Sequence, residues 1–128
     1  MVNWVPDGYV GELFRTIGRY LPPPPGLRPP VLWGSEQRLR ELFGPQVDIS
    51  APRRTFRWRF PSAEHQAEFF ASFYGPTTKA LAALPADQAA DLKADMVKVA
   101  TSFDISDDDT LVLRQDYLEA IIHKPATP

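Results

Sequence analysis

The chain has 128 residues, of which 44% are hydrophobic and 12% aromatic, and it carries a formal net charge of −2 at pH 7. This length and composition predict a single globular domain over residues 1–128, with a packed core, and argue against intrinsic disorder. The absence of cysteine excludes disulfides, thiolate zinc sites and cysteine nucleophiles. Because affinity for nucleic acid needs many Lys and Arg residues, the slightly acidic balance predicts no general nucleic-acid binding.

The N-terminal sequence MVNWVPD lacks both the basic start and the long apolar stretch of a secretory signal. No apolar run approaches the length of about 20 residues that crosses a bilayer. These features predict a cytoplasmic protein without membrane association.

The first half of the chain predicts a strand stub, two helices and a proline-rich connection. Residues 2–5 are the stub, and residues 9–20 carry apolar side chains at helical spacing. The prolines of residues 22–30 favour an extended polyproline II path. We interpret this segment as a packed internal connection, with a ligand for a proline-recognition domain as the alternative. Ser35 is the expected N-cap of a short helix that ends at Gly44.

The second half predicts two strands and three helical segments. Residues 54–60 alternate between arginine and aromatic residues, which is typical of a strand with one buried face. Ser62 is expected to cap a helix that breaks at Gly75-Pro76 and then resumes, and a further helix begins near Pro85. Residues 110–123 are apolar on both faces and predict one central strand. Three strands with four or five helices indicate an α+β fold.

Few residues form a recognisable chemical motif. The acidic patch of residues 104–109 does not match the spacing of a calcium-binding loop, so a solvated loop is the preferred interpretation. His65 and His123 are too isolated to predict a metal site. The arginines and aromatics of residues 53–60 are a mixture that single-stranded nucleic acids exploit. We prefer a structural role, with Arg57 and Arg59 on an exposed sheet face.

An aromatic stripe on the helix after Ser62 is a candidate pocket lining. Phe69, Phe70 and Phe73 fit core packing better, although aromatic faces also bind flat organic molecules. Tyr74 stands next to the break at Gly75-Pro76, where its hydroxyl is expected to face a cavity. Tyr74 is therefore the preferred site residue of this stripe.

Several short runs carry a family resemblance that covers nearly the whole chain. They are residues 3–11 (NWVPDGYVG), 17–26 (IGRYLPPPPG), 32–36 (LWGSE), 60–65 (FPSAEH), 74–76 (YGP), 110–112 (TLV) and 117–119 (YLE). Together they resemble the C-terminal portion of bacterial class I S-adenosylmethionine-dependent methyltransferases.

The resemblance implies a particular sheet and an incomplete cofactor site. Residues 2–5, 54–60 and 110–123 would be strands five, six and seven, a small three-stranded remnant of the C-terminal half of a Rossmann-like sheet, with strand seven in the middle. The family's glycine-rich turn and ribose-binding acid have no counterpart in this sequence. The resemblance therefore implies no cofactor, unless a separate N-terminal half supplies S-adenosylmethionine binding.

The resemblance also implies a substrate pocket under the proline-rich segment. We expect a methyltransferase-like domain, catalytically incomplete alone, that binds a small hydrophobic or aromatic molecule; whether it is an enzyme stays open, and no catalytic residue or metal ligand is nominated. The pocket candidates are Trp4, Tyr9, Phe14, Trp33, His65 and Tyr74. The alternative function is a protein–protein interaction module or a homodimeric structural domain. The expected partners are a second copy, paired through the exposed edge of residues 2–5, or a separate N-terminal half.

Overall fold

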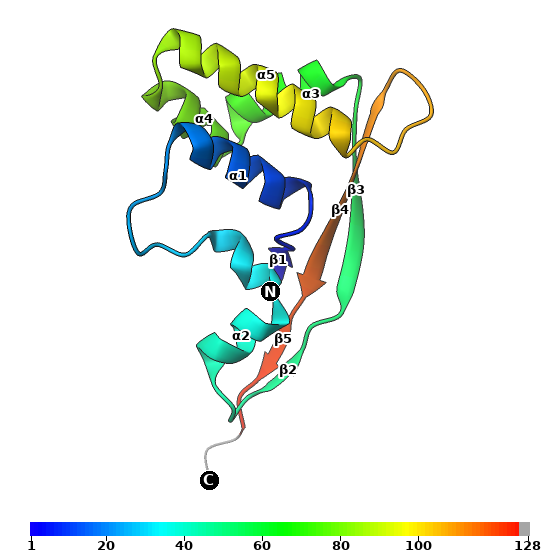
Figure 1. The fold of residues 1–128 in the computed structure, drawn as a ribbon. Coiled ribbons are helices and arrows are strands. Elements are labelled where there is room, and N and C mark those ends of the chain that lie inside the picture. The colour runs from blue at the N-terminus through cyan, green and yellow to red at the C-terminus, as the bar shows by residue number, and fades with distance from the viewer. Residues whose placement is uncertain (126–128) are drawn as a thin grey trace.

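The central sheet of the computed structural model has three antiparallel strands in the order β1 (Val2–Trp4), β4 (Leu111–Glu119), β3 (Arg53–Phe60). The structure describes residues 1–125 and confirms the predicted α+β class (Figure 1). It also confirms that the C-terminal strand lies between the other two. Because β1 and β3 each run antiparallel to β4, they are parallel to each other.

A second, two-stranded sheet pairs β2 (Asp48–Ser50) with β5 (Ile121–His123). The prediction of one strand over residues 110–123 was wrong, because the chain leaves β4 at Ala120. There, the backbone of Ala120 bonds the first residue, with Ala120 N donating to Met1 O at 2.8 Å. The strand β2 was not predicted, since three residues are too few to carry an alternating pattern.

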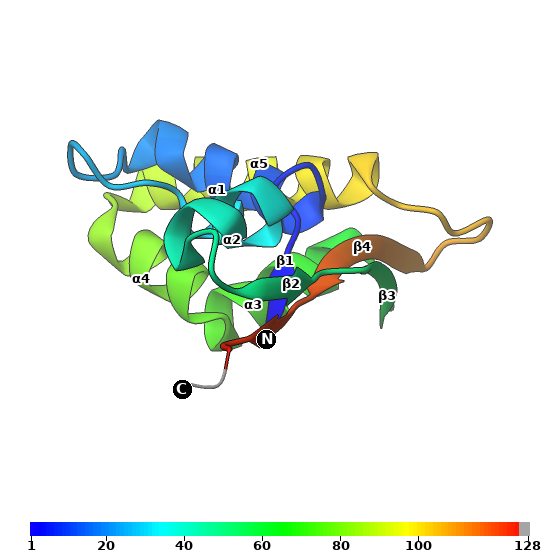
Figure 2. The same cartoon turned by 90° about the horizontal axis from the view of Figure 1, so that it is seen from below.

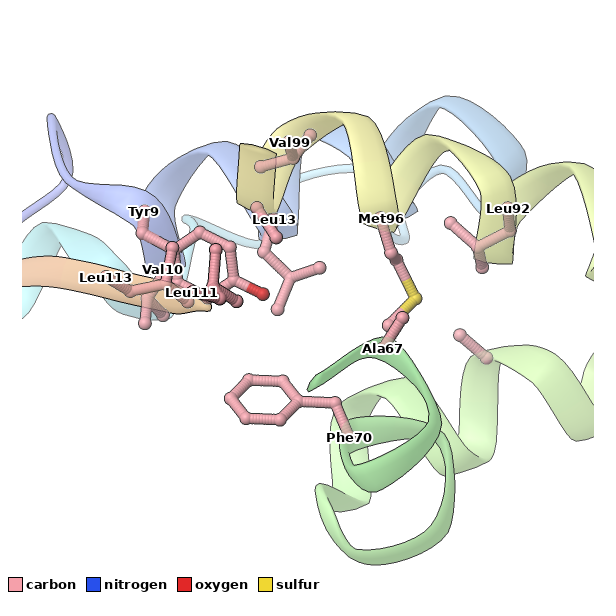
Figure 3. Close-up of a cluster of buried hydrophobic side chains, with 12 residues drawn as sticks. Tyr9, Val10, Leu13, Ala67, Phe70, Leu92, Met96, Val99, Leu111 and Leu113 are labelled. Carbon is pink, nitrogen blue, oxygen red and sulfur yellow. The ribbon is translucent and has the colours of Figure 1, made fainter. Parts of the chain in front are cut away.

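Three helices pack against one face of the three-stranded sheet, and a fourth helix packs on two of them. The three are α1 (Tyr9–Tyr20), α3 (Ala63–Phe73) and α5 (Ala86–Ser102), and the fourth, α4 (Gly75–Ala83), packs on α3 and α5. Figure 2 shows α1 and α5 side by side in one layer. Apolar side chains from α1, α3, α5 and β4 meet between the helices and the sheet (Figure 3). The buried members of this core are Tyr9, Val10, Leu13, Ala67, Phe70, Ala80, Leu92, Met96, Val99, Ala100, Leu111 and Leu113.

Local signals set the helix ends where they were predicted. Ser35 Oγ accepts a hydrogen bond from Arg38 N at the start of α2 (Glu36–Phe43), and Ser62 Oγ accepts one from His65 N at the start of α3. The helix α2 ends at Gly44, whose φ of 79° favours glycine. The break between α3 and α4 falls at Tyr74, and Gly75 and Pro76 are the first two residues of α4. These caps and breaks are properties of the local sequence.

The proline-rich segment leaves the end of α1 and returns to β1 (Figure 1). It finishes in a short 3₁₀ helix, η1 (Pro30–Gly34), which was not predicted. A Cβ on Gly34 would lie 1.9 Å from the carbonyl oxygen of Trp4. The backbone of Met1 hydrogen-bonds Ala120, and the backbone of Val5 hydrogen-bonds Asp116. Because the backbone groups of successive residues in a strand point to alternate sides, the Trp4 carbonyl points away from β4, towards the free edge of β1. The helix η1 therefore covers part of that edge.

Within residues 1–125, no helix has the length and apolar character that crossing a bilayer requires.

Candidate functional site

Two adjoining hollows lie between α1, the proline-rich segment and β1. The larger has a volume of about 410 Å³, and the smaller about 220 Å³. Phe14, Pro30 and Val31 line both, so one wall is shared. The larger is lined by Pro6, Gly11, Phe14, Arg15, Ile17, Gly18, Leu21, Pro23, Pro29, Pro30, Val31 and Leu32. The smaller is lined by Val2, Asn3, Trp4, Phe14, Pro30, Val31 and Tyr74. Most of these side chains are apolar.

The face of α1 that lines the larger hollow includes one residue, Gly18, whose missing side chain leaves open space. Gly11, Phe14, Arg15 and Gly18 recur at helical spacing and share one face of α1. A Cβ on Gly18 would meet nothing within 4 Å. Glycine within a helix costs about 0.5–1 kcal/mol relative to alanine. The glycine at position 18 therefore destabilises α1, although the fold has space for a methyl group there. The missing side chain enlarges the hollow.

The structure brings together three of the predicted pocket residues, Trp4, Phe14 and Tyr74, around the smaller hollow. The ring of Tyr74 lies 4.7 Å from that of Phe70, centroid to centroid. Tyr74 is half-buried, and this burial raises the pKa of its hydroxyl. The phenol is therefore neutral at pH 7, which suits it to donate a hydrogen bond.

A second polar residue, Asn3, lines the same hollow. Its Nδ2 atom is buried and has no hydrogen-bond partner within the described residues. Buried amide donors are usually paired, so this group is an exception within the fold. The smaller hollow therefore combines aromatic walls with two groups able to hydrogen-bond, Asn3 and Tyr74.

The other three predicted pocket residues lie away from both hollows. Tyr9 is fully buried in the core, where its hydroxyl accepts a hydrogen bond from Gln66 Nε2 at 2.7 Å and burial raises its pKa. Trp33 is 41% exposed and packs edge-on against Phe43. His65 lies in the first turn of α3, with its ring 6.4 Å from that of Phe60.

Sequence reasoning did not identify Arg15 or Gly18 as site residues. Both line the larger hollow, together with Ile17 and Leu21. A signal was available for Gly18, because a glycine inside an amphipathic helix calls for a packing or functional reason. Arg15 carried no such signal, since an arginine on the polar face of a helix is ordinary.

The turn from β1 into α1 is a strand-to-helix turn, the kind of position at which the family that the sequence resembles holds S-adenosylmethionine. The side chain of Gln115 fills the turn: its Oε1 accepts a hydrogen bond from Val10 N at 2.9 Å. A Cβ on Gly8 would lie 2.6 Å from Gln115 Nε2. The N–H of Val10 is therefore already bonded within the fold and is not available to a cofactor, so this turn does not fit S-adenosylmethionine.

The acidic loop after α5 uses its carboxylates to shape its own backbone. Asp104 accepts hydrogen bonds from Ser106 N and Val112 N, each at 2.9 Å, and these bonds lower its pKa. Asp108 is bonded by Thr110 in the same way. Across residues 1–125, no group of three His, Cys, Asp or Glu side chains is placed to hold a metal ion.

Three of the four arginines of β3, Arg53, Arg57 and Arg59, lie on the sheet face opposite the aromatics, whereas Arg54 shares the aromatic face and pairs with Glu119 at 3.5 Å. Arg53 and Thr55 both donate to the carboxylate of Asp116, whereas Trp58 packs against Tyr9 in the core. Arg57 and Arg59 are exposed, as predicted. Binding of single-stranded nucleic acid combines cationic side chains and stacking aromatics in one groove. On β3 only Arg54 shares the face of the aromatics, and Glu119 pairs with it, so the strand does not combine several free cations with stacking aromatics on one face.

Comparison with known proteins finds relatives that are longer than this chain. Uncharacterized protein Rv1403c of Mycobacterium tuberculosis is 38% identical over 82 residues, which are 62% of this chain and 30% of the relative. Uncharacterized protein Rv1405c of the same organism is 31% identical over 108 residues, 80% of this chain and 39% of the relative. The chain thus spans about a third of the length of these relatives. No protein-family model matches the chain, and no solved structure matches it significantly.

Proposed function

We propose that this chain is the substrate-binding part of a methyltransferase-like protein and binds a small apolar or aromatic molecule in the hollow between α1 and the proline-rich segment. The observation that carries the proposal is the larger hollow, which is lined mostly by apolar side chains and has a volume of about 410 Å³. Sites for small organic molecules typically have volumes of about 300–1,000 Å³ and apolar walls. Asn3 and Tyr74, which line the adjoining smaller hollow, would bond a ligand that extends past the shared wall of Phe14, Pro30 and Val31.

Two observations support the methyltransferase-like part of the proposal. The strand order β1-β4-β3 is the order that the resemblance implies for strands five, seven and six. The relatives are about three times as long as the matched segments, which leaves length in them for a separate cofactor-binding part. In this proposal the chain alone is catalytically incomplete, because it has no counterpart of the family's glycine-rich turn and ribose-binding acid, and Gln115 occupies the turn from β1 into α1.

Fluorescence of N-phenyl-1-naphthylamine, a neutral apolar dye, tests ligand binding. We expect the dye to become brighter on addition of the folded protein and to saturate at micromolar concentrations. Gly18→Leu places a side chain in the hollow and should weaken dye binding about tenfold or more, whereas Gly18→Ala should weaken it less. Dye binding that is unchanged in Gly18→Leu would show that the hollow is not the site.

Calorimetric titration with S-adenosylmethionine tests the incomplete cofactor site. We expect no heat of binding at micromolar protein concentration. Binding with a micromolar dissociation constant would overturn this part of the proposal and indicate a complete enzyme.

A second candidate function is association with another protein, with a second copy as the preferred partner. Phe69 and Phe73 of α3 are 45% and 75% exposed, and their ring centroids lie 5.0 Å apart. Exposed aromatic pairs favour association. The edge of β1 has fewer backbone groups free to pair with a second copy than the sequence suggested, because η1 covers the Trp4 carbonyl.

Light scattering coupled to size-exclusion chromatography tests this candidate. A homodimer at micromolar concentration that becomes monomeric in Phe73→Ser would support it. If the unsubstituted chain is a monomer at this concentration, the homodimer hypothesis is wrong.

A further inference from the structure

One charged side chain, Arg15, lines the otherwise apolar larger hollow. We propose that the ligand of this hollow is an amphiphilic organic anion, with an apolar body inside and a carboxylate bound by Arg15 at the mouth. This inference rests on the proposed function of the hollow as a binding site, and it adds the chemical class of the ligand.

The guanidinium of Arg15 is held in place by its own neighbourhood. Its Nε donates to Glu12 Oε2 at 2.9 Å, and its Nη1 donates to the carbonyl oxygen of Pro6 at 3.1 Å. A guanidinium has five N–H donors, so three remain after these two bonds. The group is therefore oriented before a ligand arrives, which lowers the ordering cost of binding.

The position of Arg15 suits an anionic head group at the mouth of the site. Its side chain is 55% exposed, so a carboxylate bound there keeps part of its hydration. A fully buried carboxylate would lose that hydration at high cost. A hydrogen bond between guanidinium and carboxylate is charge-assisted and stronger than a neutral one, although exposure and the nearby Glu12 weaken it.

The rest of the lining suits an apolar body. Gly18 lies one turn beyond Arg15 on the same face of α1, and Leu21 follows it. A ligand with its carboxylate at Arg15 therefore has its body across the open space at Gly18, against the walls of Pro29 and Val31. A neutral or cationic ligand would leave the free donors of Arg15 to water.

Displacement of the dye by octanoate and by 1-octanol tests the inference, since the two probes share an eight-carbon chain and differ in charge. We expect octanoate to displace the dye from the unsubstituted protein at about fivefold lower concentration than octanol. Arg15→Gln should abolish this preference by weakening octanoate alone, and Arg15→Lys should keep part of it. Arg19→Gln, on the same helix and outside the lining of either hollow, is the matched control and should keep the preference.

The outcomes separate this inference from the proposed function. Equal displacement by octanoate and octanol from a protein that binds the dye would overturn the anionic ligand and leave the apolar site standing. A preference for octanoate that survives in Arg15→Gln would overturn the role of Arg15. Failure of the unsubstituted protein to bind the dye would overturn the proposed function itself, and this inference with it.

Discussion

Gln115 and Val10 are 105 residues apart in the chain, yet the side-chain Oε1 of Gln115 accepts a hydrogen bond from the backbone N–H of Val10 at 2.9 Å. Both residues are fully buried. The residue at the N-cap position of α1 is Gly8, which has no side chain to bond the first turn. The central strand β4 therefore supplies, through Gln115, the cap that the local sequence lacks.

Replacement of Gln115 by alanine should destabilise the fold. The substitution leaves the buried N–H of Val10 without a partner, which costs about 1–3 kcal/mol. Urea unfolding at pH 7, followed by circular dichroism, measures the change in the free energy of unfolding. Gln37→Ala, at an exposed position of α2, is the control and should change that free energy by less than about 0.5 kcal/mol. Equal losses in the two variants would contradict the capping role.

Gly34→Ala should also destabilise the fold, for a steric reason. The added Cβ would lie 1.9 Å from the Trp4 carbonyl oxygen and 2.8 Å from Val5 Cα, so backbone must move. Overpacking of this kind typically costs about 1–3 kcal/mol. Thermal unfolding measures the loss, and a melting temperature that stays the same would mean that η1 does not contact β1 as described.

Gly18→Ala should have the opposite effect on stability. Its Cβ meets no atom within 4 Å, and alanine favours the helix by about 0.5–1 kcal/mol over glycine. We expect a higher free energy of unfolding together with weaker binding of the apolar dye. A variant that is more stable and also binds the dye more tightly would argue against a role for Gly18 in keeping the hollow open.

Asp104 should make the free energy of unfolding fall as the pH is lowered into the acid range. Hydrogen bonds from Ser106 and Val112 lower its pKa below the ordinary value of 3.8. Its stabilising contribution is therefore present above pH 3.8 and is lost as the pH falls through the lower pKa of the folded state. We expect Asp104→Asn to be less stable than the unsubstituted protein at pH 7, with the difference disappearing in strong acid. Denaturant titrations across this pH range measure it, and a difference independent of pH would contradict the assignment.

The parts of the fold that the sequence predicted are those with local causes. Ser35 and Ser62 cap helices through their own side chains, and Gly75-Pro76 starts α4 directly after the break at Tyr74. The short elements β2 and η1 escaped prediction because contacts distant in sequence hold them in place: β2 pairs with β5, and Gly34 of η1 packs on Trp4.

The candidate site was predicted only in part. Trp4, Phe14 and Tyr74 meet at one hollow, as three members of the predicted set. Tyr9 lies in the core instead, where Gln66 Nε2 donates a hydrogen bond to its buried hydroxyl. The larger hollow depends on how the proline-rich segment lies against α1, and residue spacing on a single helix contains no information about that packing.

The most direct test of the central claim is a map of amide chemical-shift changes in the ¹H–¹⁵N spectrum on addition of N-phenyl-1-naphthylamine. We expect the largest changes at Phe14, Gly18, Leu21, Val31 and Leu32, which line the larger hollow. Changes confined to the exposed aromatics Phe69 and Phe73 of α3, or no changes at saturating dye, would contradict this expectation.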